Sequence, residues 1–341
     1  DLSCNNNQLT SLDLSNNSYL DTIVCVGNPF NNLDFSNTNV AILDLSALTS
    51  LTNLDVSNNS FLTSLVCNDL QLSNLTLGNN SALTNLNCSG NQLTSLNLNI
   101  DTFFITNLNV SDNQLTSLDL SHSPYIDTFF CSGNQLTQLD LSTNLALNNL
   151  NCSNNQLTSL NIGIDTFFIT NLNVSNNQLT SLNLSNFPHI DTFFCSDNQL
   201  NCLNIKNGYN NFISDFDASS NPNLSCIEVD DSSWAVINWT GIDSNVVFSN
   251  NCNNACSNPI TALQSNTYSF NIFPNPFTTS TTIELPSEPH TLTIYDIVGN
   301  KVREEQVSGT TTIERDNLTK GVYVLEVRSV SQTYSGKLVV E

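Results

Sequence analysis

Residues 86–121 read LNCSGNQLTSLNLNIDTFFITNLNVSDNQLTSLDLS, and residues 150–185 repeat them with few changes as LNCSNNQLTSLNIGIDTFFITNLNVSNNQLTSLNLS. The two copies lie 64 residues apart. Within each copy a shorter phrase recurs, Leu-x-x-Leu-x-Cys or Leu-x-x-Leu-x-Leu. A fixed internal period is typical of repeat architectures, so the period decides the fold.

The phrase forms two interleaved series with steps of mostly 20–22 residues. Its final alternation of apolar and polar residues predicts a short strand with one buried face. Asn, Ser, Gly and Asp fill the gaps, where they favour turns. The first series ends at Cys4, Cys25, Leu45, Cys67, Cys88, Val110, Cys131, Cys152, Val174, Cys195 and Ala218, and the second at Leu14, Phe35, Val56, Leu77, Leu98, Leu120, Leu141, Ile162, Leu184, Ile205 and Val229.

A unit this short cannot bury its apolar edge alone, so successive coils must stack, each adding about 4.8 Å. The sequence therefore predicts a mainly β protein. Residues 1–229 form a solenoid of eleven coils with parallel strands, roughly 50 Å long at that spacing.

The pattern LxxLxCxxNxL, as in Leu83, Leu86, Cys88, Asn91 and Leu93, resembles the leucine-rich repeat. The version with an in-line cysteine resembles internalin-type repeats of bacteria. The resemblance implies that the asparagine at the strand exit points inward and bonds the backbone of the turn. These residues are Asn91, Asn113, Asn134, Asn155, Asn177 and Asn198.

The seven cysteines of the first series share their position with Leu45, Val110, Val174 and Ala218, so we interpret them as small buried apolar residues. One cysteine per coil, without histidine partners, does not bring four metal ligands to one point. Disulfides between stacked coils remain an alternative, although in-register side chains give poor bridging geometry. We expect no metal and no cofactor.

The leucine rhythm stops after residue 229, and we expect residues 230–256 to cap the open end of the solenoid. Four cysteines lie outside the ladder: Cys202, Cys226, Cys252 and Cys256. An even number of cysteines outside the ladder predicts disulfides if the chain reaches an oxidising compartment. Cys226 with Cys252 would close the cap, and Cys202 pairs with Cys256 or, alternatively, with Cys226. The alternative to these disulfides is a redox or metal site formed by Cys252 and Cys256.

Residues 257–267 are polar and without periodicity, which predicts a linker. From residue 268 the composition changes to β-branched residues, Lys and Glu. TLTIYDIVGNKVREEQV reads as a hairpin turning at Val298–Asn300, and GVYVLEVRS and YSGKLVVE read as further strands. Residues 268–341 are thus predicted to form a small antiparallel, Ig-like sandwich.

The phrases NIFPNPF, IYDIVGNKV, NLTKGVYVLEV and GKLVVE, in this order, resemble the type A sorting domain of the type IX secretion system. The resemblance implies export across the outer membrane of a Gram-negative bacterium. It also implies removal of the domain, with attachment of the passenger to surface lipopolysaccharide or its release. The motif positions are Pro274, Asn275, Pro276, Asp296, Gly299, Leu318, Gly321, Tyr323 and Lys337. The last residue, Glu341, departs from the basic residue common there.

The charge is strongly uneven. Residues 1–264 carry 21 acidic groups and one basic residue, Lys206. Such a surface repels phosphate backbones and anionic membranes, so we expect no nucleic-acid partner. No apolar run is long enough to span a bilayer. The three histidines, His122, His189 and His290, are scattered, and no catalytic motif is present, so we expect no enzyme.

Two surface features are candidate sites. Alternation places Phe130 and Phe194 on the outward face of their strands, where they are candidate ligand anchors unless neighbouring loops cover them. The nearby residues Phe103, Phe104, Phe167 and Phe168 are expected to fill the interior at turns. A row of outward carboxylates is a weaker calcium candidate without a DxDxDG loop. This row is Asp13, Asp34, Asp55, Asp119 and Asp140.

The sequence begins in the middle of a repeat, so we expect it to be part of a longer protein. We predict a secreted or cell-surface leucine-rich repeat protein that binds an extracellular protein or glycan, as an adhesin or recognition module. The alternative is a rigid spacer or accessory region of a larger exported enzyme whose catalytic domain lies upstream of residue 1.

Overall fold

The computed structural model describes the chain except for residues 31–32, 49, 79, 99–103, 164–167, 253–255, 257–271, 286–288, 297–300, 329–332 and 341. It divides into two compact units, Asp1–Ile260 and Thr261–Glu341. The linker expected at residues 257–267 and the turn expected at Val298–Asn300 lie outside the described residues.

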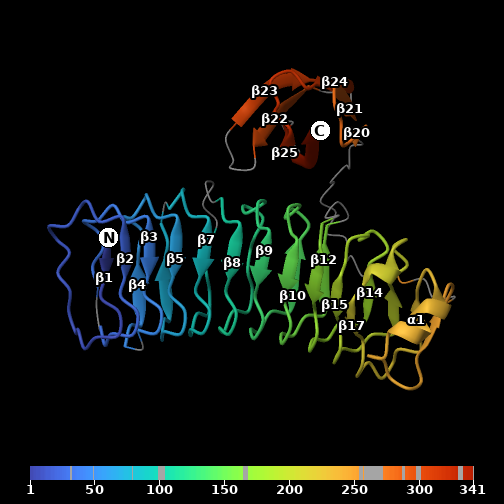
Figure 1. Cartoon of the computed structure of the whole chain (residues 1–341), viewed down its shortest axis with the longest axis horizontal. Coiled ribbons are helices and arrows are strands. Elements are labelled where there is room, and N and C mark those ends of the chain that lie inside the picture. Colours follow the sequence, from blue (N-terminus) through green and yellow to red (C-terminus); the bar gives the residue numbers. More distant parts are fainter. Residues whose placement is uncertain are drawn as a thin grey trace. The chain divides into compact units, whose positions relative to one another are not determined.

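The first unit is a stack of short coils that runs from β1 at the left of Figure 1 to α1 at the right, and its main feature is one parallel sheet of eleven strands. One strand comes from each coil, and neighbouring strands pair in parallel register, as in Leu86 with Leu108. The eleven-coil solenoid predicted from the period is confirmed. The strands, in spatial order, are β1 (Leu2–Ser3), β2 (Thr22–Val24), β3 (Ile42–Asp44), β5 (Ser64–Val66), β7 (Asn85–Asn87), β8 (Asn107–Asn109), β9 (Thr128–Phe130), β11 (Asn149–Asn151), β13 (Asn171–Asn173), β15 (Thr192–Phe194) and β17 (Asp215–Asp217).

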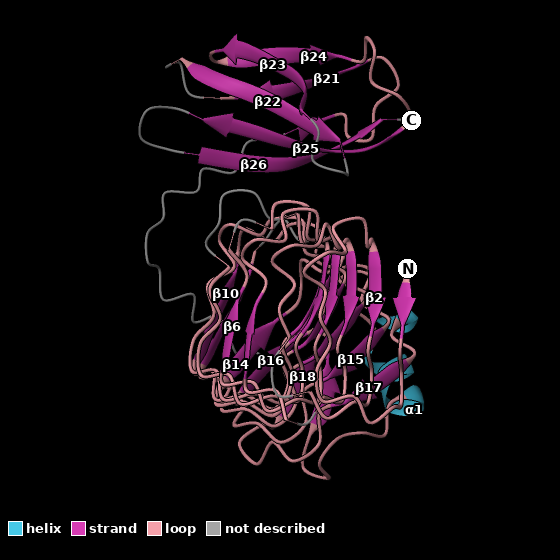
Figure 2. Ribbon diagram, turned by 90° about the vertical axis from the view of Figure 1, so that its left-hand side faces the viewer, coloured by secondary structure: helices cyan, strands magenta, loops and turns pink. Residues whose placement is uncertain are grey.

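The second series lies on the opposite side of each coil (Figure 2). Here the structure differs from the expected continuous row of strands, because the described residues of this side form three separate parallel sheets. Leu96, Leu98 and Leu120 lie between these sheets and are buried all the same, so apolar burial holds this side in register without a ladder. The sheets are β4 (Asn53–Asp55) with β6 (Asn74–Thr76), β10 (Gln138–Leu141) with β12 (Ser159–Ile162), and β14 (Ser181–Asn183), β16 (Cys202–Asn204), β18 (Cys226–Glu228) and β19 (Val247–Ser249).

The asparagines at the strand exits hold consecutive coils together. The side chain of Asn134 donates to the carbonyls of Cys131, in its own coil, and Val110, in the preceding coil, at 3.2 and 2.9 Å. Its oxygen accepts the N–H of Leu115 at 2.9 Å. Asn91, Asn113, Asn155, Asn177 and Asn198 make the same set of bonds. The inward asparagine ladder implied by the resemblance is confirmed.

The turn that follows each strand needs a left-handed residue two positions after the first-series residue. All eleven coils have positive φ there, which explains why Gly, Asn and Asp dominate this position. At Gly133, with φ of +66°, an added Cβ would lie 2.2 Å from the Asp112 carboxylate. The eleven residues are Asn6, Gly27, Ala47, Asp69, Gly90, Asp112, Gly133, Asn154, Asn176, Asp197 and Ser220.

The end of the solenoid is closed by aromatic rings beneath a short helix. The 3₁₀ turn η1 (Asn210–Phe212) and helix α1 (Ser232–Asn238) lie near this end, and Asp231 caps α1 by accepting the N–H groups of residues 233 and 234. Buried Trp239 stacks on Phe216 with ring centroids 4.4 Å apart and donates to the carbonyl of Ile213. A helix was not expected in the cap, although Asp before SSWAVIN is an N-cap signal.

The second unit is an antiparallel sandwich of two sheets, as the sequence predicts. Its core contains Phe277, Leu292, Ile294 and Leu325. One sheet consists of β20 (Ile272–Phe273), β21 (Ser280–Glu284) and β24 (Thr310–Glu314), and the other of β23 (Lys301–Val307), β22 (His290–Asp296), β25 (Gly321–Arg328) and β26 (Thr333–Val340).

Replacement of Asn134 by alanine tests the ladder. The Asn134→Ala variant leaves backbone groups of two coils buried without partners, and we expect unfolding to become easier by about 2–3 kcal/mol. Urea unfolding of the full chain measures this. The matched control is Asn149→Ala, an outward residue of β11, which should change stability by less than about 0.5 kcal/mol. Equal effects of the two variants would contradict the ladder's role.

Candidate functional site

The outward face of the eleven-stranded sheet is built from two rows of side chains. They flank the buried central residue of each strand, because side chains alternate along a strand. Ten coils contribute to both rows, and the side chains are mainly amides and hydroxyls with three carboxylates and no basic group. The rows are Thr22, Ile42, Ser64, Asn85, Asn107, Thr128, Asn149, Asn171, Thr192 and Asp215, and Val24, Asp44, Val66, Asn87, Asn109, Phe130, Asn151, Asn173, Phe194 and Asp217.

Phe130 and Phe194 lie in the second of these rows. Phe130 pairs in register with Asn109 on one side and Asn151 on the other. Phe194 lies three strands further along, about 14 Å away at the usual strand spacing. Both are half-buried, whereas Phe129 and Phe193, one residue earlier, are fully buried. Phe130 thus stands between two amides, and Phe194 stands between the amide of Asn173 and the carboxylate of Asp217.

The ladder thiols are placed for packing. Cys25, Cys67, Cys88, Cys131, Cys152 and Cys195 are buried, and Cys4 is half-buried in the first coil. Burial raises the pKa of Cys88 and Cys152 to about 12, because a thiolate has no solvation in the core. For Cys25, burial and the neighbouring Cys4 thiol, whose sulfur lies 3.1 Å away, raise the pKa to about 12.

Thiols that keep their protons in this way are poor nucleophiles and poor metal ligands. Among the described residues, no three side chains of His, Cys, Asp or Glu gather at one point to hold a metal ion.

The row of outward carboxylates has a local structural role. Asp13 accepts the N–H of Ser15 at 2.9 Å, and this hydrogen bonding by Ser15 lowers the pKa of Asp13. Asp34 and Asp55 have the same partner two residues ahead, and their pKa values are lowered for the same reason. Asp119 and Asp140 repeat the bond. These carboxylates stabilise turns within their own coils.

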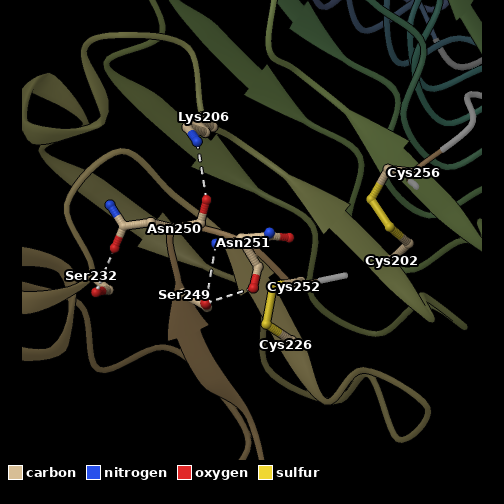
Figure 3. The surroundings of a disulfide bond; sticks show 9 residues. All are labelled: Cys202, Lys206, Cys226, Ser232, Ser249, Asn250, Asn251, Cys252 and Cys256. Atoms are coloured by element: carbon tan, nitrogen blue, oxygen red, sulfur yellow. Dashed lines mark hydrogen bonds between the residues drawn. A yellow bond between two sulfur atoms is a disulfide. The ribbon is translucent and has the colours of Figure 1, made fainter. Parts of the chain in front are cut away.

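Two disulfides fasten the cap (Figure 3). Cys226 of β18 is bonded to Cys252, and Cys202 of β16 is bonded to Cys256. The structure therefore has neither the Cys202–Cys226 link nor a free Cys252–Cys256 pair. Beside them, Lys206 donates to the carbonyl of Asn250 at 3.0 Å, which ties the segment after β19 to the solenoid.

The motif residues of the second unit join its first loop to its last strand. Asn275 accepts the N–H of Val339 at 2.8 Å, and Phe277 donates to the carbonyl of Val339 at 3.0 Å. Tyr323 is buried, and its hydroxyl donates to the carbonyl of Thr319 at 2.8 Å. The loop that contains Pro274 and Pro276 is thereby held against β26.

The other motif positions have structural places as well. Leu318 is buried, Gly321 begins β25 and Asp296 ends β22. Lys337 lies in β26, and Gly299 lies outside the described residues. Arg315 was not predicted, yet its guanidinium bonds the carbonyls of Thr278 and Leu318 across the unit.

Residues 271–341 match the family described as the secretion system C-terminal sorting domain. This unit is a type IX secretion sorting domain. The resemblance of the C-terminal residues to a sorting domain is confirmed, and this domain indicates export of a chain whose first unit has a leucine-rich-repeat-like solenoid fold. A comparison with curated proteins found no match.

Several solved structures are similar to this chain. The functional domain of InlJ from Listeria monocytogenes, described as including a cysteine ladder, is 20% identical with a TM-score of 0.46, over 100% of this chain and 80% of that one. A leucine-rich repeat protein of Leptospira interrogans is 20% identical with a TM-score of 0.45, over 58% and 60%. The internalin InlF of Listeria monocytogenes is 16% identical with a TM-score of 0.40, over 72% and 85%.

Within the described part of the chain, no helix has the length and apolar character needed to cross a bilayer.

Buried thiols make stability depend on pH. The unfolded Cys88 thiol ionises above its ordinary pKa of 9.0, whereas the folded thiol keeps its proton to about 12. The contribution of Cys88 is therefore fully present below pH 9 and is lost as the pH rises toward 12, by about 1.4 kcal/mol per pH unit. Urea unfolding between pH 8 and about pH 11 measures the slope. Cys88→Val, which copies the Val110 coil, should reduce it, and an unchanged slope would show that Cys88 is not buried as a thiol.

Removal of the Cys226–Cys252 bond should loosen the cap. The bond closes 26 residues, and we expect the double variant Cys226→Ser with Cys252→Ser to lose about 2–4 kcal/mol. Thermal unfolding measures the loss, and non-reducing peptide mapping tests the pairing itself. A peptide that links Cys202 to Cys226 would contradict the assignment.

Proposed function

We propose that the solenoid is a non-catalytic recognition module that binds an extracellular protein or glycan on the outward face of its eleven-stranded sheet. The observation that supports this is the placement of Phe130 and Phe194 on that face. Rings that stand half-exposed among polar groups are typical of binding surfaces, where aromatic anchors provide contact area and amides provide direction.

The chemistry of the rest of the first unit favours binding over catalysis. The thiols are buried and hold their protons, and the outward aspartates are engaged in turns. The described residues offer a rigid, periodic surface, because every coil is joined to the next by strand pairing and most coils are also joined by an inward asparagine. A rigid surface loses little conformational freedom on binding, which benefits affinity.

We further propose that the protein acts at the outer surface of a Gram-negative bacterium, as an adhesin. The sorting domain supports export, and its family resemblance supports removal of residues 268–341 with attachment of the passenger to lipopolysaccharide or release. The acidic first unit, with one basic residue in residues 1–264, favours a passenger that stays soluble beside an anionic cell surface.

Loss of the two rings tests the binding face. The double variant Phe130→Ala with Phe194→Ala should weaken binding about tenfold or more, because aromatic anchors contribute most of the affinity of a surface. The full chain is applied to arrays of extracellular proteins and glycans, and its melting temperature should not fall. Val66→Ala, an aliphatic residue of the same row, is the matched control and should bind normally.

Two results would count against this function. Unchanged binding of the double variant removes Phe130 and Phe194 as the site. Absence of binding to any member of both arrays favours a spacer or an accessory region of a larger exported enzyme, for which a catalytic motif upstream of residue 1 should then be found.

A further inference from the structure

A second aromatic feature lies outside the two rows of the binding face. It is the residue directly before the first buried aliphatic side chain of each coil, on the approach to the strand. Ten coils align at this position, and seven of the ten residues carry an aromatic or imidazole ring. We call these residues the aromatic row: Tyr19, Asn39, Phe61, Ala82, Phe104, Tyr125, Ala146, Phe168, His189 and Phe212.

The rings of this row are accessible. Tyr19 is 97% exposed, Phe61 60% and Phe212 63%. Phe104 and Phe168 are half-buried, and neither belongs to the apolar core. The expectation that these two residues fill the interior is therefore wrong, because the side chain that enters the core is the next one along the chain. Phe103 and Phe167 lie outside the described residues.

Neighbouring members of the row face the same side of the solenoid. The rings of Phe104 and Tyr125, in consecutive coils, have centroids 5.5 Å apart. The rings of Phe168 and His189, the corresponding residues of the duplicated block, are 6.4 Å apart and nearly parallel, with an interplanar angle of 14°. Ten coils at about 4.8 Å make the row about 43 Å long from Tyr19 to Phe212.

The rings are not needed to form a coil. Asn39, Ala82 and Ala146 occupy the same position, and the aliphatic residues that follow Ala82 and Ala146, Leu83 and Leu147, are fully buried all the same. Aromatic rings that the core does not require, arranged in a line at the surface, mark a surface for a ligand. A linear row with a coil-by-coil repeat fits a linear ligand that itself repeats.

The surroundings of the row specify the chemistry of that ligand. The only basic residue before position 300, Lys206, is engaged at the cap, so the row offers no cation to an anionic chain. The strands that follow it present amides and hydroxyls, such as Asn85, Asn107 and Thr128. A ligand that fits both the aromatic rings and the polar strand residues has apolar C–H faces, which contact the rings, and hydroxyl groups, which bond the amides.

We propose that the aromatic row is a binding track for a linear, uncharged polysaccharide. Successive sugars stack on successive rings, and their hydroxyl groups form hydrogen bonds with the amides and hydroxyls at the first residues of the strands. The rings of the track lie outside the row that contains Phe130 and Phe194, and the track borders the first polar row of the sheet face, so it goes beyond the function proposed above.

Affinity electrophoresis of the full chain tests the track, with hydroxyethyl cellulose, xylan, mannan and laminarin as uncharged probes. We expect at least one of them to retard the wild-type chain. The triple variant Phe61→Ala, Phe104→Ala and Phe168→Ala should bind that probe about tenfold more weakly. The double variant Ala82→Phe with Ala146→Phe fills two gaps in the row and should bind it more tightly.

The controls distinguish binding on the aromatic row from binding on the sheet face and from binding of an anionic polysaccharide. Asn39→Ala changes the row without removing a ring and should bind like the wild type. Loss of retardation in Phe130→Ala with Phe194→Ala, together with unchanged retardation of the triple row variant, would place the polysaccharide on the sheet face and overturn the proposal. The double variant Ala82→Phe with Ala146→Phe, which should bind more tightly, keeps the test decisive if the triple variant does not fold. No retardation by any uncharged probe, equal retardation of all row variants, or preference for polygalacturonate would overturn the proposal.

Discussion

Every coil of this solenoid has to reverse direction twice, and each reversal leaves backbone groups inside the stack without strand partners. At the strand exit of most coils an inward asparagine resolves this, whereas buried Leu48 and Leu70 take the same position in two coils. The asparagine amide donates to carbonyls of its own coil and of the coil before, and its oxygen accepts an N–H of the preceding coil, as at Asn134. Because unsatisfied buried polar groups are strongly destabilising, this side chain fixes both the turn and the register between coils. The rest of the structure depends on it.

Once the register is fixed, each position of the repeat becomes a row along the molecule. The thiols form one row inside, where the same place is taken by Val110 and Val174. The left-handed turn residues form another, which accounts for the glycines and asparagines. Outside, Phe130 and Phe194 stand on the sheet face, and the aromatic row runs beside it. A surface organised this way offers a ligand several similar contacts at one spacing, which supports the recognition function proposed above.

Much of this was readable from the sequence, because spacing alone fixes which residues point inward. The eleven coils, the buried thiol row and the sorting domain follow from the period and the motifs. Three features did not follow. The second strand series breaks into three sheets, since leucine burial there needs no continuous ladder. Helix α1 lies after the last repeat, where the repeat pattern gives no information about secondary structure. The sequence does not predict the aromatic row, because the apolar character of Phe104 and Phe168 favours a place in the core. The buried residue is instead the isoleucine that follows each of them.

Anomalous diffraction from the native sulfur atoms of crystals of this protein tests the central claim most directly, because it locates each cysteine without assuming the fold. The account predicts that the sulfurs of the seven ladder cysteines lie in one file along the solenoid, with neighbours in consecutive coils such as Cys67 and Cys88 about 5 Å apart. Sulfurs gathered around a bound ion, or scattered off a common line, would contradict the in-register stack.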